Sequence, residues 1–144
     1  MAVHDRAELD QDWCRVRRAT RASLMSDTKW RKVFASLADH TELGLRQCVY
    51  KFVESAEERI GSPDVWLWPP RPWVDTSSFG PISLRSIEWL LFPRVAEYRT
   101  DRTRPPRCEP QDVDGAWRIL TELGQLPLEM TERGLLLRGH LSAG

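Results

Sequence analysis

A segment rich in tryptophan and proline, from Trp66 to Trp73, most limits how this chain can fold. It holds three of the chain's seven Trp and three of its ten Pro. Proline has no backbone N–H to donate to a β-ladder, so the strand predicted at 65–68 must end at Pro69. Trp66 and Trp68 share one face of that strand, and a strand that is apolar on both faces is usually central and covered. We therefore expect at least one of these two tryptophans to lie in the core.

The sequence gives less reason to place Trp73 in the core than Trp66 or Trp68. It follows Arg71 and Pro72 and precedes the polar stretch 75–78. An exposed Trp beside an Arg is typical of an interface hot spot. Packing of Trp73 against the sheet is the alternative, and both interpretations stay open.

The rest of the chain predicts a single α+β domain. Apolar residues at i, i+3, i+4 and i+7 predict helices at 28–39 and 112–123. Alternating apolar residues predict strands at 45–53, 65–68, 82–92, 126–130 and 135–141. Tyr50 and Phe52 are expected to face the core, as are Trp30, Trp89 and Trp117. The order α-β-β-β-α-β-β favours a mostly antiparallel sheet of about five strands with two packed helices.

The remaining segments are predicted to be connections. Residues 54–64 are expected to form a polar loop, and 93–110, rich in Arg and Pro, a surface connection. Within 82–92 the apolar parity changes, which predicts a bulge near Arg85. The last two strands are expected to pair as a hairpin around Gly134.

The N-terminal residues 1–25 differ from the rest. Acidic residues come first and arginines follow at 15–21, an order that complements a helix dipole. We expect an extension at 1–25, either disordered or a marginal helix, followed by the α+β domain at 26–144. Met25 precedes cap-type residues and is a candidate initiator.

Composition narrows the classes of partner. Lys+Arg 21 balance Asp+Glu 21, and this balance argues against a nucleic-acid partner. No apolar stretch is long enough to span a bilayer, and the N-terminus lacks the apolar region of a secretory signal. Cys14, Cys48 and Cys108 are widely spaced and fit free thiols. We therefore expect a cytoplasmic protein with no membrane association, no cofactor and no metal site.

The titratable residues predict no catalytic residue. His4, His40 and His140 have no Ser or Cys near them in the context of a nucleophile elbow. A Ser–His or Cys–His pair could therefore arise only through the fold. Close carboxylates such as Glu129 and Glu132 are better interpreted as turn residues than as a paired acid and base. No glycine-rich phosphate loop is present.

Three segments together are similar to a family of small bacterial proteins of unknown function. They are Lys29-Trp30-Arg31-Lys32-Val33-Phe34, Gly80-Pro81-Ile82-Ser83-Leu84-Arg85-Ser86-Ile87-Glu88-Trp89-Leu90, and the ending from Leu126 to His140. The resemblance covers roughly residues 28–141. The family tends to finish its hairpin with Gly plus an aromatic residue, and His140 stands at the aromatic place. The resemblance implies an α+β fold but no activity, so it transfers no catalytic residue.

The leading hypothesis is a non-enzymatic protein-binding module. A natural role is that of an immunity or antitoxin-type protein that caps a toxin domain. The expected contact residues lie in the Pro/Trp segment and the Arg-rich connection: Arg71, Trp73, Arg99, Arg102 and Arg104. The alternative is a small-ligand-binding protein or an enzyme with a pocket lined by Trp66, Trp68 and Trp73.

Overall fold

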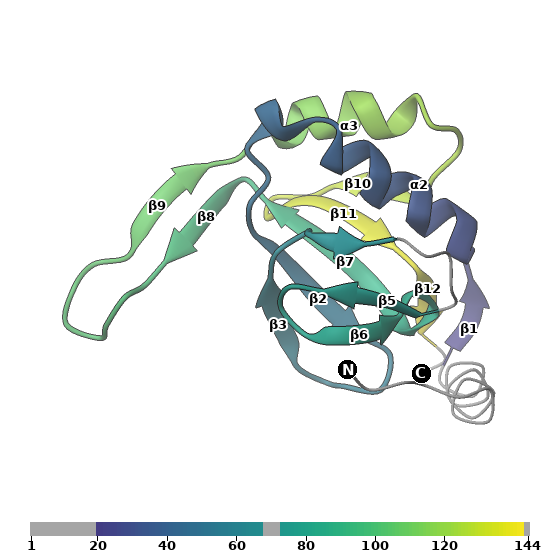
Figure 1. Ribbon diagram of the computed structural model, residues 1–144, viewed down its shortest axis with the longest axis horizontal. Coiled ribbons are helices and arrows are strands. Elements are labelled where there is room, and N and C mark those ends of the chain that lie inside the picture. The colour runs from purple at the N-terminus through teal and green to yellow at the C-terminus, as the bar shows by residue number, and fades with distance from the viewer. Residues whose placement is uncertain (1–19, 68–72, 143–144) are drawn as a thin grey trace.

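The computed structural model describes residues 20–67 and 73–142, and Figure 1 shows how its elements are arranged. The helices are α2 (Asp27–Ala38) and α3 (Val113–Thr121), with short 3-10 helices η1 (Thr41–Leu43) and η2 (Leu84–Ser86). The first six strands are β1 (Thr20–Ser23), β2 (Cys48–Phe52), β3 (Glu58–Gly61), β4 (Val65–Trp66), β5 (Trp73–Thr76) and β6 (Gly80–Ser83). The others are β7 (Ile87–Pro93), β8 (Val95–Tyr98), β9 (Arg107–Pro110), β10 (Leu128–Met130), β11 (Gly134–Arg138) and β12 (His140–Ser142).

Within the described residues, all strand pairs are antiparallel. The largest sheet has five strands in the order β10-β11-β7-β2-β3, and a smaller one has the order β4-β5-β6. Two further pairs, β1-β12 and β8-β9, complete the set. The predicted α+β class is confirmed. The predicted order and strand count are not, because the chain forms more and shorter strands.

Both predicted helices form, and each begins at a side-chain cap. Ser26 accepts a hydrogen bond from the Lys29 N–H at 3.2 Å, and Asp112 accepts one from the Gly115 N–H at 2.8 Å. These caps satisfy N–H groups that have no partner within the helix. The stripe of α2 is buried as expected, at Trp30, Val33, Phe34 and Leu37. That of α3 is buried at Val113, Ala116 and Leu120.

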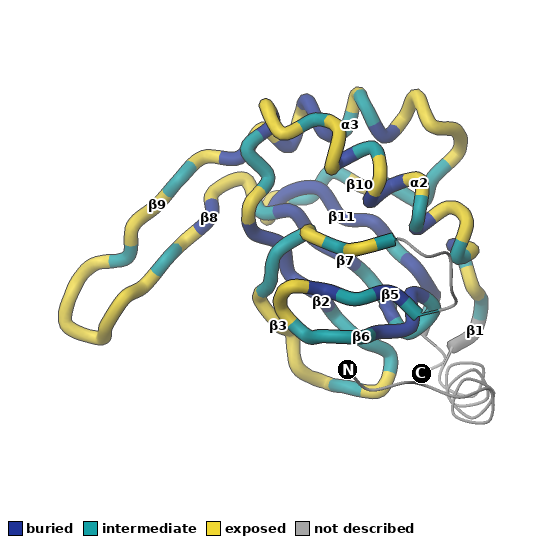
Figure 2. Tube along the Cα trace, viewed as in Figure 1, coloured by how far each residue is buried: buried dark blue, intermediate teal, exposed yellow. Residues whose placement is uncertain are grey.

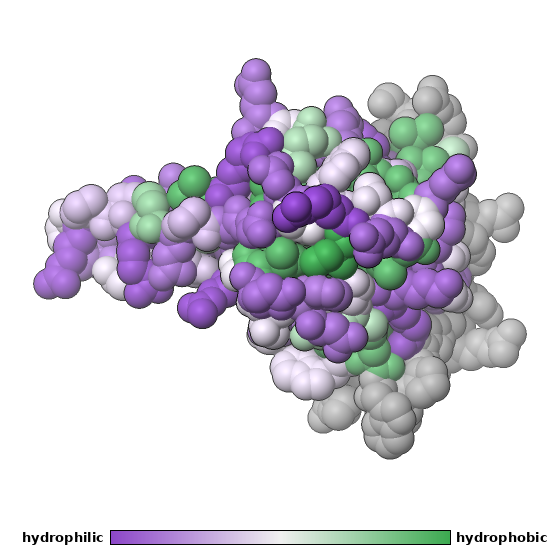
Figure 3. All heavy atoms as spheres, turned by 90° about the horizontal axis from the view of Figure 1, so that it is seen from above, coloured by the Kyte–Doolittle hydropathy of each residue, from purple (hydrophilic) through white to green (hydrophobic). Residues whose placement is uncertain are grey.

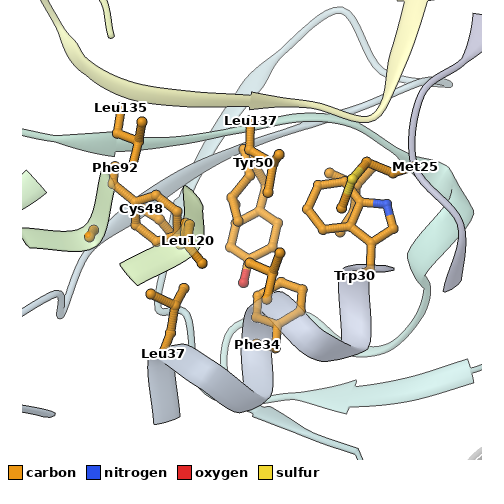
Figure 4. Packing of buried hydrophobic residues seen from close by; sticks show 14 of the residues in the cluster. Met25, Trp30, Phe34, Leu37, Cys48, Tyr50, Phe92, Leu120, Leu135 and Leu137 are labelled. Atoms are coloured by element: carbon orange, nitrogen blue, oxygen red, sulfur yellow. The ribbon is translucent and has the colours of Figure 1, made fainter. Parts of the chain in front are cut away.

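The core lies against one face of the five-stranded sheet, which we call the inner face. Figure 4 shows Trp30, Phe34 and Leu37 of α2 directed toward Tyr50 and the leucines of β11. Tyr50 is fully buried and Phe52 packs against the same cluster, which confirms both predictions. The three-stranded sheet contributes to this core too, since Val74 and Ile82 belong to it.

The opposite, outer face of the five-stranded sheet carries a second apolar cluster. Val49, Leu91 and Leu136 are each under 10% exposed there, and Trp89 packs against them. They lie on neighbouring strands in direct register, Val49 beside Leu91 and Leu91 beside Leu136. The buried residues of α2 and α3 belong to the core, so neither helix covers this face.

Two segments predicted to be connections contain strands. Strand β3 lies within 54–64 and pairs with β2, while β8 and β9 lie within 93–110 and pair with each other. These predictions were wrong because most of the strand residues are exposed. Edge and projecting strands lack the buried apolar face that reveals a strand in a sequence.

The predicted strand at 82–92 is divided by a turn. It becomes β6, then η2, then β7. A 3-10 turn at Leu84–Ser86 interrupts it, and the register of β7 against β2 then shifts between Ile87 and Trp89, close to the predicted bulge. The C-terminal hairpin is confirmed, with Leu128 opposite Leu137 and Met130 opposite Leu135.

The end of the predicted N-terminal extension takes part in the fold. Strand β1 pairs with β12, and Met25 is 7% exposed within the core. The backbone N–H of Leu24 also donates to the Gly139 carbonyl at 2.8 Å. Residues 1–19 lie outside the described residues, so the prediction for that stretch stays a prediction.

Candidate functional site

The predicted contact residues are divided between two regions. Trp66 and Trp73 lie in the three-stranded sheet, whereas Arg99, Arg102 and Arg104 lie in the loop between β8 and β9. Figure 1 shows the β8–β9 hairpin projecting away from the rest of the fold. Arg71 and Trp68 lie outside the described residues.

Trp66 and Trp73 share one face of the three-stranded sheet, together with Asp75. Trp66 of β4 pairs with Asp75 of β5, and Asp75 lies two residues after Trp73, so all three share one face. Trp66 is 57% exposed and therefore does not lie in the core. Because Trp68 lies outside the described residues, the expectation that at least one of the two lies in the core stays a prediction. Val65 and Leu67 pack against the core instead. Strand β4 is an edge strand covered on one face only, and its apolar outward residue is therefore left in solvent.

The root of the β8–β9 hairpin, residues 95–110 and from here the arm, is fixed by Gln47. This glutamine is 8% exposed. Its Nε2 donates to the Glu97 carbonyl at 2.9 Å, and its Oε1 accepts from the Glu97 N–H at 3.1 Å. Ala96, the neighbour of Glu97, is 1% exposed. The side-chain amide thus acts as one more strand residue beside the base of β8.

A second buried glutamine, Gln111, holds the other side of the root. Its Oε1 accepts from the backbone N–H groups of Arg46 and Gln47, both at 2.9 Å. Its Nε2 donates to the carbonyls of Gln47 at 3.0 Å and Pro93 at 2.9 Å. All four hydrogen-bonding positions of the side-chain amide are used. Because both glutamines bind backbone, they fix the direction in which the arm leaves the body.

The tip of the arm is shaped by Asp101. Its Oδ1 accepts from the Thr103 N–H at 2.8 Å, from the Thr103 hydroxyl at 2.7 Å and from the Arg104 N–H at 2.9 Å. These hydrogen bonds, that of the Thr103 hydroxyl first, hold the pKa of Asp101 below its ordinary value. Such side-chain-to-backbone bonds give a loop a defined turn. The tip therefore forms a turn that is held by hydrogen bonds within the tip itself.

The tip presents arginine to solvent. Four arginines stand against one acidic residue, Asp101, between positions 99 and 107. The Arg107 guanidinium lies 5.1 Å from the centre of the Tyr98 ring, a cation–π contact. Arg99 and Arg102 form no ion pair with any residue in the described ranges. Figures 2 and 3 show that the arm is largely exposed and hydrophilic.

Among the described residues the fold brings one Ser–His pair together, Ser23 and His140. The Ser23 Oγ lies 3.0 Å from His140 Nδ1, and the His140 Nε2 lies 2.6 Å from the Arg85 carbonyl. Because a carbonyl can only accept, Nε2 carries the proton and Nδ1 accepts from the Ser23 hydroxyl when the ring is neutral. His140 is 2% exposed. Its hydrogen bonds connect β1, β12 and η2, so its role in this structure is to hold these elements together.

The other described histidine, His40, is held in a structural contact. His40 Nδ1 lies 2.7 Å from the Ser36 carbonyl at the end of α2. His4 lies outside the described residues. In the described ranges no cluster of three His, Cys, Asp or Glu could hold a metal ion. No helix there is long and apolar enough to cross a membrane.

Two surface grooves are lined by tryptophans other than those predicted. One, of about 440 Å³, lies beside Trp117 of α3. The other, of about 450 Å³, lies over Trp89 on the outer face. Trp30 is fully buried as expected, but Trp89 and Trp117 are only half-buried. Neither Trp66 nor Trp73 lines either groove.

Sequence reasoning missed the residues that build these features. Gln47 and Gln111 are polar and gave no signal, since a glutamine is usually exposed. The arm itself had a faint signal in the short four-residue segments Val95–Tyr98 and Arg107–Pro110. Trp89 was assigned to the core because it alternates with Ile87 and Leu91, but Ile87 lies in the core and Leu91 in the outer cluster.

Comparison of the chain with models of protein families, with curated proteins and with solved structures finds no match. The resemblance to a family of small bacterial proteins therefore stays a prediction.

Proposed function

We propose that this chain is a non-enzymatic protein-binding domain that presents the arm to its partner. The single observation that carries the proposal is a projecting hairpin with a rigid root and an arginine-rich tip. An isolated two-stranded hairpin is marginally stable in water. Here Gln47 and Gln111 fix its base, and Asp101 shapes its end. A hairpin supported at both ends, but packed against little, is suited to contact with another molecule.

The chemistry of the tip favours a partner with an acidic surface. Guanidinium groups bind carboxylates through two parallel hydrogen bonds. Arg99 and Arg102 have their donors available, since no described residue pairs with them. The formal net charge of the whole chain is +0. The rest of the chain therefore balances the tip with an excess of acid, and this uneven distribution would orient the arm toward an acidic surface.

A toxin-capping role, as an immunity or antitoxin-type protein, is the specific form that we propose. Such a protein must bind its partner quickly and hold it. Electrostatic steering raises association rates, and a preformed loop avoids the ordering cost of binding. The arm offers both properties in one element.

The proposal is tested by affinity purification from the native host, comparing wild type with the double variant R99E/R102E. The matched control is R59E/R118E, which reverses two exposed arginines on the body. Wild type and control should retain the same partner protein, and R99E/R102E should retain at least about tenfold less. Like charges juxtaposed at an interface cost several kcal/mol.

Three results would contradict the proposal. They are full recovery of the partner with R99E/R102E, no partner with any form, or a partner that nuclease treatment removes. The last result would reassign the arm to nucleic acid. The toxin-capping role has its own test, coexpression with the neighbouring gene product. A product that is harmless when expressed alone would exclude that role and leave protein binding intact.

A further inference from the structure

The groove over Trp89 differs from the arm tip in its lining, which combines apolar side chains with charged ones. Its floor consists of two residue pairs that stand directly opposite each other on β7 and β11. Trp89 faces Arg138, and Leu91 faces Leu136. Directly opposite residues on one face of a sheet have their Cβ atoms about 4.5–5.5 Å apart. The floor is therefore an indole beside the aliphatic stem of Arg138, whose guanidinium is directed toward Glu129 on β10.

The turn between β10 and β11 forms the wall of the groove. Thr131, Glu132 and Arg133 all line it. From this turn Arg133 reaches Glu58 on β3, with Nη2 2.8 Å from Oε1 and Nη1 3.4 Å from Oε2. Strand β3 is the opposite edge of the sheet, so the Arg133 side chain crosses the outer face. Both terminal nitrogens of the Arg133 guanidinium are therefore engaged by the Glu58 carboxylate.

Arg138 differs from Arg133 in being weakly engaged. A single contact joins it to Glu129, at 3.4 Å, and both side chains are about half exposed. A guanidinium has five N–H donors, so Arg138 can bind another anion while keeping this contact. An anion bound there lies on the β10 side of β11, and the Trp89 ring lies on the β7 side of the same groove.

We propose that this groove binds an aromatic monoanion, such as an aromatic carboxylate. The ring stacks on Trp89, and the carboxylate binds Arg138. The volume of about 450 Å³ lies within the range of about 300–1,000 Å³ that is usual for ligand sites. Glu132 places a negative charge on the rim, and it disfavours a dianion such as a phosphate monoester. This site is separate from the arm and does not depend on the proposed function.

The test uses three probes that share one ring: 1-naphthoate, 1-naphthyl phosphate and 1-naphthylmethylamine. Isothermal titration calorimetry of the full chain should give a Kd for 1-naphthoate of about 0.1–1 mM, as expected for a ligand of this size. The dianion and the cation should bind at least about tenfold more weakly. R138Q should weaken 1-naphthoate about tenfold, and W89A by a similar factor.

Matched controls keep the proposal open to contradiction. R99Q removes an exposed guanidinium on the arm, and W66A removes an exposed indole on the other sheet. Both should leave 1-naphthoate binding unchanged. If W89A does not fold, W89F and R138Q decide the question, because W89F retains an aromatic ring. The proposal is overturned if 1-naphthoate does not bind, if the phosphate or the amine binds more tightly, or if R138Q binds like wild type.

Discussion

The two faces of the five-stranded sheet use the same kinds of residue but are covered in different ways. On the inner face, Leu135 and Leu137 are fully buried beneath two helices. On the outer face, Leu136 is 9% exposed although neither helix reaches it. A charged side chain, Arg133, crosses the outer face instead.

This difference shows that a low exposed fraction of a side chain does not by itself place that side chain in a core. Buried residues surrounded by apolar atoms on every side gain dispersion contacts as well as removal from water. The outer residues pack against the half-buried Trp89 and border an open groove. Such a surface can rearrange around a ligand, whereas the inner face cannot.

The largest expected effect compares two adjacent leucines of β11. Leu137→Ala should lower the free energy of unfolding by about 3–5 kcal/mol, because the helices above it cannot close the cavity. Leu136→Ala should lower it by about 1–2 kcal/mol, since water and Arg133 can fill the space. Urea unfolding measures both. Equal losses would show that the outer face is as tightly packed as the inner one.

A second prediction concerns the buried hydrogen bonds of Gln111 at the root of the arm. Gln111→Ala leaves two N–H groups and two carbonyls of the arm root without their partner, and should destabilise the chain by about 2–4 kcal/mol. Hydrogen exchange of the arm amides should also become faster. Gln125→Ala, at an exposed position, is the matched control. Unchanged exchange in the arm would mean that Gln111 does not hold its root.

Alkaline pH should lower the stability of the fold through two buried groups on the inner face, Cys48 and Tyr50. Burial raises the pKa of the Cys48 thiol and of the Tyr50 phenol far above their ordinary values. The unfolded chain releases these protons above about pH 9 while the folded chain retains them, so stability is full below that pH and falls above it. The loss is about 1.4 kcal/mol per pH unit for each group.

Denaturant unfolding between pH 7 and 11 checks this prediction. Cys48→Ala should reduce the slope of stability against pH, and Cys108→Ala, at an exposed thiol, should not. The same slope in Cys48→Ala as in wild type would contradict the assignment.

The smallest expected effect is that of the ion pair over the outer face. Arg133 and Glu58 are 57% and 45% exposed, so water screens them. A double-mutant cycle with Arg133→Gln and Glu58→Gln should give a coupling of about 0.5 kcal/mol. The coupling should disappear in about 1 M salt, where the Debye length is about 3 Å. A coupling above 2 kcal/mol that resists salt would place the pair in a buried environment.

Much of the fold could be predicted where residues have a buried side. Both helices, the core face of β2 and the C-terminal hairpin follow from spacing alone, because an apolar stripe must be covered. The strands β3, β8 and β9 could not be found in this way. Their side chains are mostly exposed, and what makes them strands is the backbone of a partner.

The candidate site was harder to predict. The arginines at 99, 102 and 104 were predicted to be contact residues from composition, and this stays a prediction; the arm that carries them was not predicted. Trp66 shows the limit most clearly. Its neighbours Val65 and Leu67 are apolar too, and the sequence contains no sign of which face the core would occupy.

The sequence by itself determined the α+β class, the two helices and the residues that form the inner core. These depend on local periodicity and on the exclusion of apolar surface from water. Only the tertiary structure decided that Gln47 and Gln111 fix a projecting arm, that Arg133 crosses the outer face and that Trp89 lines a groove. Each of these features joins residues far apart in the chain, and a linear pattern carries no record of such pairs.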